Sequence, residues 1–350
     1  LYGRVGEDHF VVIADEDTFN EEYLYECRET LQNVLSDSVY NVRVCFGIYR
    51  TDNMNESLSF MCDKASFAVA SIKDDTHSFI AYYDDTMLEA AIKYKTIVDE
   101  FDDAIKAGEF KMYLQPQISA KTRRLTGAEA LVRRIKPDGT IISPIDFIPV
   151  YEKSGLISRL DRYIWEQAAA KLGEWKKAGI NMSISVNISP KDFYYIDIFN
   201  TFAGLIKKYD IEPSNLKIEI TETTIMSDVP NLMGELEELR KAGFTLEMDD
   251  FGSGYSSLNT LKDINVDVLK VDMGFIKETK NVKKSRIILA SVIKMAKELN
   301  LLIITEGVET EEQVDNLTKL GCDVFQGYYF SKAIDVNEFE KRYLYRKKAG

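Results

Sequence analysis

Acidic, amide and lysine side chains recur at the downstream ends of short apolar runs in this chain. The runs are GAEALVR (127–133), ISVNIS (184–189), LKIEITE (216–222), FTLEMDDFGSGYSSL (244–258), VDVLKVD (266–272) and LIITEGVE (302–309). If these carboxylates meet at one place, they repel one another unless a divalent cation neutralises them. Ligand sets made only of oxygen favour Mg²⁺ or Mn²⁺. The pattern therefore predicts a magnesium or manganese site.

Helical patterns separate most of these runs, which predicts an α/β fold of the TIM-like (β/α)8 barrel type with its chemistry at the C-terminal ends of the strands. Alternate residues of a strand face opposite sides. We expect the apolar faces to pack on outer helices and the other faces to point to the barrel axis. The axial faces are Glu129, Leu131 and Arg133; Ser185, Asn187 and Ser189; Lys217, Glu219 and Thr221; and Val268, Lys270 and Asp272.

Composition excludes several classes of function. The formal charge is −13, from 44 basic and 57 acidic residues, and no basic stripe is present, so we expect no binding of duplex nucleic acid. An anionic substrate requires cations that reverse the local field. The two histidines, His9 and His77, both precede the barrel segment, which argues against a histidine-based mechanism or a zinc site there.

The sequence also bears on compartment and domain organisation. Its four cysteines show no close pairing, and no apolar run approaches the ~18 residues that span a bilayer, so we expect a cytoplasmic chain. The chain begins at Leu1 rather than Met, and we expect a fragment whose upstream sensor region lies outside it. Residues 1–84 predict part of an α/β domain, residues 85–107 a helical linker, and residues 96–350 the barrel.

Seven short motifs follow one another in the barrel segment: E-A-L at 129–131, then VNIS, EITE, DDFGSGYSSL, LKVD, EGVE and QGYYF. In this order they resemble the EAL-domain family of cyclic di-GMP phosphodiesterases, over about residues 110–335. SPIDFIPVYEKSGLI (143–157) is similar to the segment that follows in that family. One departure is Arg134, where the family often has Trp.

The resemblance implies hydrolysis of cyclic di-GMP to linear pGpG with two Mg²⁺ or Mn²⁺ ions per site. It implies that the first metal is held by Glu129, Asn187, Glu219 and Asp249, and that Asp249 bridges to a second metal whose site Asp250 completes. Glu306 is then a metal ligand or the base that activates water, and Lys270 orients the water or steadies the phosphate. Of the remaining acidic residues, Asp272 partners Lys270 or shapes the pocket, Glu309 holds water or the loop, and Glu222 anchors the DDFGSGYSS loop. Adjacent aspartates cannot both point inward from a regular strand, and Gly252 and Gly254 would allow the bend.

Substrate contacts and assembly also follow from the resemblance. Gln115 and Gln326 match positions near a guanine or phosphate, Arg133 matches a phosphate contact, and Leu131 lies on the same face. Three aromatic residues, Phe147, Tyr151 and Tyr328, are candidates to stack on guanine or, alternatively, to belong to the core. The family also implies a possible homodimer through the EAL domain.

The first 84 residues resemble the C-terminal part of a GGDEF domain, the diguanylate cyclase fold, through RVGEDHFVVI (4–13). The signature is degenerate, because Glu7 stands in place of the second glycine and His9 in place of a metal-binding glutamate. We therefore expect a regulatory role and no cyclase activity.

Two other functions are compatible with parts of the pattern. The first is a catalytically idle receptor that holds cyclic di-GMP without cutting it. The second is an aldolase-like barrel in which Lys270 forms a Schiff base, in which case the carboxylate set would be surplus.

Overall fold

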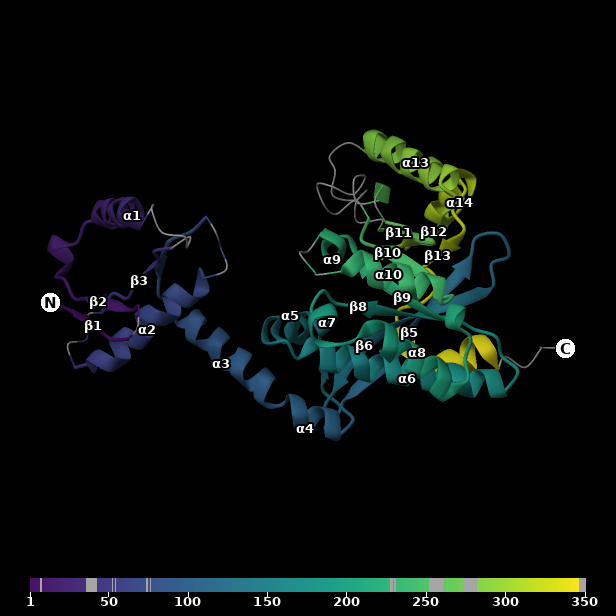
Figure 1. Ribbon diagram of the computed structural model, residues 1–350, viewed down its shortest axis with the longest axis horizontal. Helices are drawn as coiled ribbons and strands as arrows, with labels where there is room; N and C mark the ends of the chain where they lie inside the picture. Colours follow the sequence, from purple (N-terminus) through teal and green to yellow (C-terminus); the bar gives the residue numbers. More distant parts are fainter. Residues whose placement is uncertain are drawn as a thin grey trace. The chain divides into compact units, whose positions relative to one another are not determined.

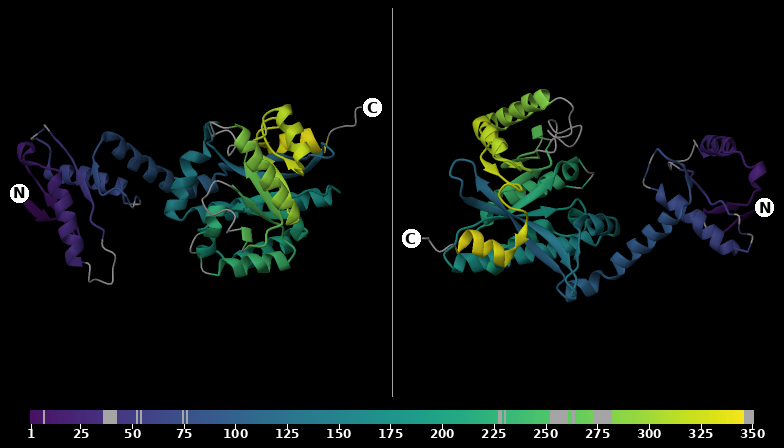
Figure 2. Two further views of the ribbon diagram at one scale, coloured as in Figure 1. Left: turned by 90° about the horizontal axis from the view of Figure 1, so that it is seen from above. Right: turned by 180° about the vertical axis from the view of Figure 1, so that it is seen from behind.

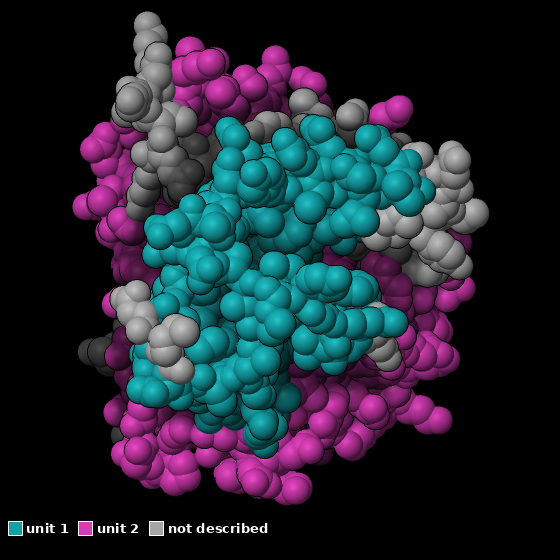
Figure 3. Space-filling model, turned by 90° about the vertical axis from the view of Figure 1, so that its left-hand side faces the viewer, with its two compact units in different colours: residues 1–99 teal, residues 100–350 magenta. Residues whose placement is uncertain are grey.

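The computed structural model describes residues 1–350 except 7, 36–42, 52, 54, 74, 76, 227–228, 230, 252–260, 263, 273–281 and 346–350. Three residues interpreted from the sequence, Glu7, Gly252 and Gly254, lie outside the described residues. The chain forms two compact units, Leu1–Asp99 and Glu100–Gly350, which are coloured separately in Figure 3. Among the described residues, no helix is both long and apolar enough to cross a membrane.

The first unit is a small α/β unit. Its elements are β1 (Tyr2–Arg4), β2 (Phe10–Val12), η1 (Glu16–Thr18), α1 (Glu22–Leu35), β3 (Phe46–Ile48), α2 (Leu58–Ser71), β4 (Ile80–Tyr82) and α3 (Asp85–Asp99). Strands β1 and β2 pair antiparallel, and β3 and β4 pair parallel. Helix α2 packs closely on β3, since a Cβ at Gly47 would lie only 2.0 Å from the Ala65 carbonyl oxygen.

The second unit begins with a short helix and then a strand hairpin. Its strands are β5 (Phe110–Ser119), β6 (Leu125–Ile135), β7 (Ile141–Ile142), β8 (Ile184–Ile188), β9 (Leu216–Thr221), β10 (Leu246–Asp249), β11 (Val268–Asp272), β12 (Leu302–Glu306), β13 (Val324–Phe325) and β14 (Ile334–Asp335). Its helices are α4 (Phe101–Lys106), α5 (Pro144–Ser154), α6 (Ile157–Lys177), α7 (Asp192–Tyr195), α8 (Ile198–Tyr209), η2 (Pro213–Asn215), α9 (Glu222–Met226), α10 (Leu232–Lys241), α13 (Val282–Glu298), α14 (Glu311–Leu320), α15 (Val336–Phe339) and η3 (Glu340–Leu344).

The strands of the second unit close into a barrel, as the sequence predicts. The hydrogen-bonded order is β5-β13-β12-β11-β10-β9-β8-β6, and β6 pairs with β5 to complete the ring. Strands β6 and β8 to β13 run parallel, whereas β5 is antiparallel to both neighbours. The regular TIM barrel therefore has one reversed strand here, because β5 and β6 form a hairpin. Figures 1 and 2 show helices α6, α8, α10, α13 and α14 around the outside.

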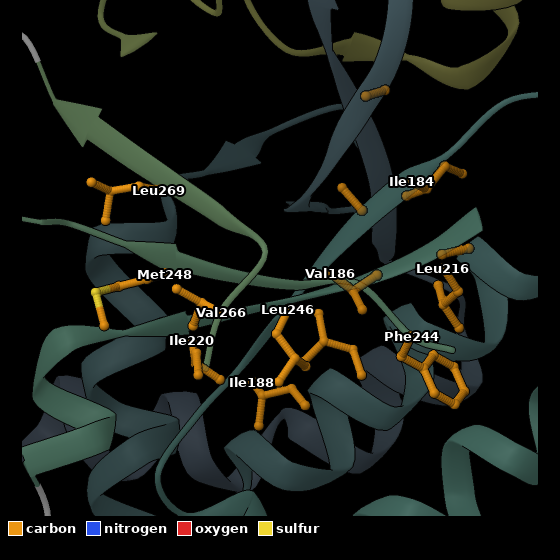
Figure 4. Packing of buried hydrophobic residues seen from close by; sticks show 14 of the residues in the cluster. Ile184, Val186, Ile188, Leu216, Ile220, Phe244, Leu246, Met248, Val266 and Leu269 are labelled. Carbon is orange, nitrogen blue, oxygen red and sulfur yellow. The ribbon is translucent and has the colours of Figure 1, made fainter. Parts of the chain in front are cut away.

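The outward faces of the strands form the main core. Figure 4 shows the apolar side chains of β8, β9 and β10 packed toward the surrounding helices, and they include Ile184, Val186, Ile188, Ile220 and Leu246. All are 3% exposed or less. Burying such side chains supplies about 25 cal/mol per Å² of apolar surface, which fixes each strand in register with its polar face toward the axis.

Candidate active site

Four carboxylates from four strands surround one ammonium group inside the barrel. The Nζ atom of Lys270 lies 2.9 Å from Glu306 Oε1, 3.1 Å from Glu219 Oε1, 3.3 Å from Asp249 Oδ2 and 3.4 Å from Glu129 Oε2. Lys270 and Glu219 are fully buried. We call these five residues the carboxylate cluster.

Strand register brings the cluster together. Asn187 and Glu219 are Cα partners on β8 and β9, and Asp272 and Glu306 are partners on β11 and β12. Because these strands are parallel, their carboxyl ends meet at the same end of the barrel. The residues predicted from six separate runs therefore reach one opening.

Burial and mutual repulsion perturb the ionisation of the cluster. Burial raises the pKa of Glu219 well above its usual value, and the charge of Glu129 raises it further. Burial also raises the pKa of Glu306 well above its usual value, and the charge of Asp249 adds to the rise. Burial alone would lower the pKa of Lys270, but the surrounding carboxylates raise it well above its ordinary value, so Lys270 is held as an ammonium.

A chain of side-chain amides lines the same opening. Asn187 Nδ2 donates to Glu129 Oε1 at 3.4 Å, and Gln326 Nε2 donates to Glu129 Oε2 and, at 3.3 Å, to Gln115 Oε1. Gln117 Nε2 donates to Gln326 Oε1 at 3.3 Å. The sequence analysis missed Gln117, although its spacing of two residues from Gln115 places both on one face of β5.

The donor set fits a divalent cation. Four carboxylates and one ammonium would carry a net charge of −3 if every group were ionised, and the raised pKa values of Glu219 and Glu306 reflect that repulsion. Carboxylate and amide oxygens are the ligands that Mg²⁺ and Mn²⁺ prefer. Within the described residues, no three Asp, Glu, His or Cys side chains are already arranged as a metal cluster.

The backbone turns at the second aspartate of the pair. Strand β10 ends at Asp249, and Asp250 has φ of +56°, a left-handed conformation that is uncommon outside glycine. The Asp250 amide donates to Asp249 Oδ1 at 2.8 Å. Although the Asp250 residue is exposed, partial desolvation of its carboxyl and the charge of Asp249 raise the pKa of Asp250. The bend expected after this pair thus starts at Asp250 itself.

Three further acidic residues lie at or just after the ends of strands β11, β9 and β12. Asp272 is exposed at the end of β11, closer to the open end than Lys270. Glu222 is 1% exposed and begins α9 directly after β9. Glu309 is exposed, and its amide donates to Gln313 Oε1 at 2.7 Å in the capped start of α14.

The candidate substrate residues divide between the opening and the core. Arg133 is half-buried, and its Nη1 donates to the Val132 carbonyl at 2.7 Å. Leu131, on the same face of β6, is also half-buried, and Tyr328 is 63% exposed, with Lys332 Nζ 5.1 Å from the centre of its ring. Phe147 and Tyr151 are fully buried in an aromatic group with Phe101 and Phe110, so they belong to the core and do not stack on a ligand.

The sequence analysis gave no role to a buried carboxylate, Glu247, which lies just beneath the cluster. Its Oε1 accepts from Lys217 Nζ at 2.9 Å, and its Oε2 accepts from Ser185 Oγ at 2.8 Å. Lys217 and Ser185 were placed on axial faces by the alternation of their strands. The same alternation, applied to LEMD, would have placed Glu247 on the face of Asp249.

Comparison with known proteins identifies the barrel. The EAL domain family model matches residues 98–333. The signaling protein YkoW of Bacillus subtilis is 31% identical over 344 residues, which cover 97% of this chain and 43% of YkoW. The probable cyclic di-GMP phosphodiesterase PdeG of Escherichia coli is 36% identical over 252 residues, or 70% of this chain and 48% of PdeG.

Among solved structures, the PaMucR phosphodiesterase in complex with c-di-GMP is 32% identical, with a TM-score of 0.65, over 70% of this chain and 99% of that one. The chain spans about half the length, or less, of the curated relatives named above. The matched region contains both the closed barrel and the carboxylate cluster. The chain therefore belongs to the EAL domain family.

Proposed function

We propose that this chain is a phosphodiesterase that uses Mg²⁺ or Mn²⁺ to hydrolyse cyclic di-GMP to linear pGpG. The observation that carries the proposal is the convergence of Glu129, Glu219, Asp249 and Glu306 on one buried position at the mouth of the barrel. Related proteins named as cyclic di-GMP phosphodiesterases, and a relative solved with c-di-GMP, support the choice of substrate.

The residues divide into a metal-binding set and a reacting set. Glu129, Asn187, Glu219 and Asp249 would hold one cation, and Asp249 with Asp250 would hold the second. When bound, the two cations neutralise charge on the phosphate and make water more acidic. Glu306 lies beside this set and would ligate a metal or accept the proton of the attacking water.

Lys270 supplies the fixed positive charge of the site. Its ammonium donates toward the carboxylate cluster from a fully buried position, where a charge acts more strongly than in water. We assign it the orientation of the attacking water or the steadying of a phosphate oxygen. The attacking water loses a proton as its oxygen forms the new bond to phosphorus. The bond from phosphorus to the 3′ oxygen breaks, that oxygen takes up a proton to become a hydroxyl, and the product is linear pGpG.

The other groups at the opening would recognise the dinucleotide. The guanidinium of Arg133 would bind a phosphate of the dinucleotide. The side-chain amides of Gln115 and Gln326, which hydrogen-bond to each other, would contact the dinucleotide at the same opening. Tyr328 offers an exposed ring at the edge, on which a base would stack. Leu131 and Asp272 would shape the pocket, Glu309 would hold water or its loop, and Glu222 would anchor the loop after Asp250.

The experiment is incubation of the purified chain with cyclic di-GMP and Mn²⁺, Mg²⁺ or a chelator, followed by chromatography. We expect pGpG with either metal and none with the chelator. A matched pair of variants is Glu219→Gln and Glu311→Gln, because Glu311 is exposed on α14. The first should lose turnover and the second should retain it. Binding of cyclic di-GMP without pGpG would instead establish the idle receptor.

We further propose that residues 1–84, which resemble a degenerate GGDEF domain, regulate the activity of the barrel. Of the two residues that depart from the cyclase signature, His9 is within the described residues. It is exposed in the segment between β1 and β2. The test is turnover of cyclic di-GMP with and without GTP. A changed KM or kcat supports nucleotide control, and unchanged kinetics with no GTP binding would remove GTP as its effector.

A further inference from the structure

A buried ion pair lies directly beneath the carboxylate cluster. Glu247 on β10 is fully buried and bonds to Lys217 on β9 and Ser185 on β8, at 2.9 and 2.8 Å. The Lys217 side chain is 17% exposed. We call these three residues the charged floor.

Register places the charged floor one layer below the cluster on the same inward face. Glu247 precedes Asp249 by two residues on β10, and Lys217 precedes Glu219 by two residues on β9; Glu247 is also the Cα partner of Glu219 across these strands. Ser185 likewise precedes Asn187 by two residues on β8. Residues two apart on a strand share a face, so each member of the floor lies beneath a candidate metal ligand.

Packing alone does not require charges at this depth. Another part of the barrel interior is filled by an apolar group of Val268, Ile304 and Val324. A buried ion pair is often no more stabilising than apolar side chains of similar volume, because desolvation offsets the Coulomb attraction. The carboxylate of Glu247 therefore calls for an explanation other than stability.

Glu247 is the Cα partner of Glu219 on the neighbouring strand β9. The charge of Glu247 acts on Glu219, whose pKa is raised by burial, by Glu129 and then by Glu247. Glu247 and Lys270 also attract each other, in addition to the attraction between Glu247 and Lys217. Glu219 Oε1 lies 3.1 Å from the Lys270 ammonium, and Glu247 is the Cα partner of Glu219, so the Glu219 carboxylate lies between a positive and a negative neighbour.

We propose that Glu247, held by Lys217 and Ser185, is a positioning residue that increases the affinity of the carboxylate cluster for divalent cations. Its negative charge lies next to Glu219 and favours a cation above it, while Lys217 keeps that charge from destabilising the metal-free barrel. The inference rests on the proposed function, because it takes Glu219 as a metal ligand.

The experiment measures Mn²⁺ binding to the intact chain without substrate, from the electron paramagnetic resonance signal of free Mn²⁺. The variants are Glu247→Gln, Lys217→Met and the double variant, each checked for folding by circular dichroism. Loss of an outer partner of a metal ligand typically weakens binding on the order of 10–100-fold, and we expect this for Glu247→Gln. Lys217→Met should bind Mn²⁺ no more weakly than the unmodified chain, and the double variant should recover most of the loss.

The sign of the two effects separates positioning from a structural role. A floor that only supports the fold predicts weaker binding in both single variants, and that result would overturn the inference, as would unchanged binding in Glu247→Gln. If Glu247→Gln does not fold, Lys217→Met is compared with the double variant. The inference then requires the double variant to bind Mn²⁺ more weakly than Lys217→Met does. If the unmodified chain itself binds no Mn²⁺, the proposed function fails; if it binds and the floor variants match it, only this inference fails.

Discussion

Lys270 Nζ and Glu306 Oε1 lie 2.9 Å apart, at the ends of two neighbouring parallel strands, β11 and β12. This is the shortest of four contacts between the Lys270 ammonium and carboxylates. Four carboxyl groups at the mouth of the barrel share this one ammonium, so Lys270 can balance only part of the negative charge that they carry when ionised.

Replacing Lys270 by Met should abolish turnover and destabilise the metal-free chain. The change leaves four carboxylates without their ammonium, and breaking a buried ion pair costs roughly 3–5 kcal/mol of unfolding free energy. Urea unfolding and chromatography of pGpG are the measurements. The control is Lys294→Met, whose exposed ion pair with Glu298 spans 4.0 Å and should be worth less than about 1 kcal/mol. Equal stability of the two variants would contradict the account.

Divalent cations should raise the melting temperature of the chain, because they bind the folded cluster and not the unfolded chain. At a concentration 100 times Kd the gain is about 2.7 kcal/mol. Calcium should inhibit the reaction, since its larger radius and looser coordination suit water activation poorly. Thermal melts and turnover in Mg²⁺, Mn²⁺ and Ca²⁺ test both points. Equal turnover in Ca²⁺ and Mg²⁺ would show that the metals have another role.

A pair of neighbouring acids outside the cluster, the buried Asp192 and the half-buried Asp161, should make stability depend on pH. Burial raises the pKa of Asp192 to about 6 and raises that of Asp161 well above its usual value. An unfolded aspartate has a pKa of about 3.9, so the folded state holds the proton more tightly. The contribution of Asp192 is thus fully present below about pH 4 and is lost as pH rises through about 6, a change of about 3 kcal/mol.

The measurement for this pair is urea unfolding between pH 4 and 7. Asp192→Asn should reduce the slope, because an amide does not titrate, and the Asn oxygen can still accept from the Ser189 amide, which donates to Asp192 at 2.8 Å. Asp103→Asn, at an exposed position of α4, is the matched control and should leave the slope unchanged. An unchanged slope in Asp192→Asn would assign the pH dependence to other groups.

Arg134, which occupies a position where the family often has Trp, should contribute strongly to the unfolding free energy of the chain. It is 1% exposed and bonds to Glu100 at 2.6 Å and to Glu109 at 2.9 Å. Arg134→Ala removes the partner of Glu109, which is itself mostly buried, and should cost roughly 3–5 kcal/mol. Arg286→Ala, at an exposed position, should change the unfolding free energy by less than about 1 kcal/mol. Similar losses in both variants would contradict this assignment.

The alternation of polar and apolar residues was enough to predict the inward faces of the strands. It placed Asn187 and Glu219 on axial faces, and the observed register makes them neighbours. It could not predict that Lys270 contacts four carboxylates, since that depends on distances between strands that are far apart in sequence. Nor could it pair Lys217 with Glu247, which are 30 residues apart and meet only when β9 and β10 align.

Two other features required the three-dimensional structure. Strand β5 runs against its neighbours, and a strand pattern carries no direction. Phe147 and Tyr151 were candidates for stacking on a base, but they are buried with Phe101 and Phe110, which come from segments more than 30 residues away. The sequence around Phe147 and Tyr151 does not show that aromatic residues from distant segments bury them.

The central claim is that the carboxylate cluster binds divalent cations, and the most direct test is anomalous diffraction from crystals grown with Mn²⁺ and cyclic di-GMP. The account predicts manganese peaks about 2 Å from oxygens of Glu129, Glu219 and Asp249, with a phosphate of the dinucleotide beside them. Manganese peaks elsewhere, or a dinucleotide bound with no metal at these carboxylates, would contradict it.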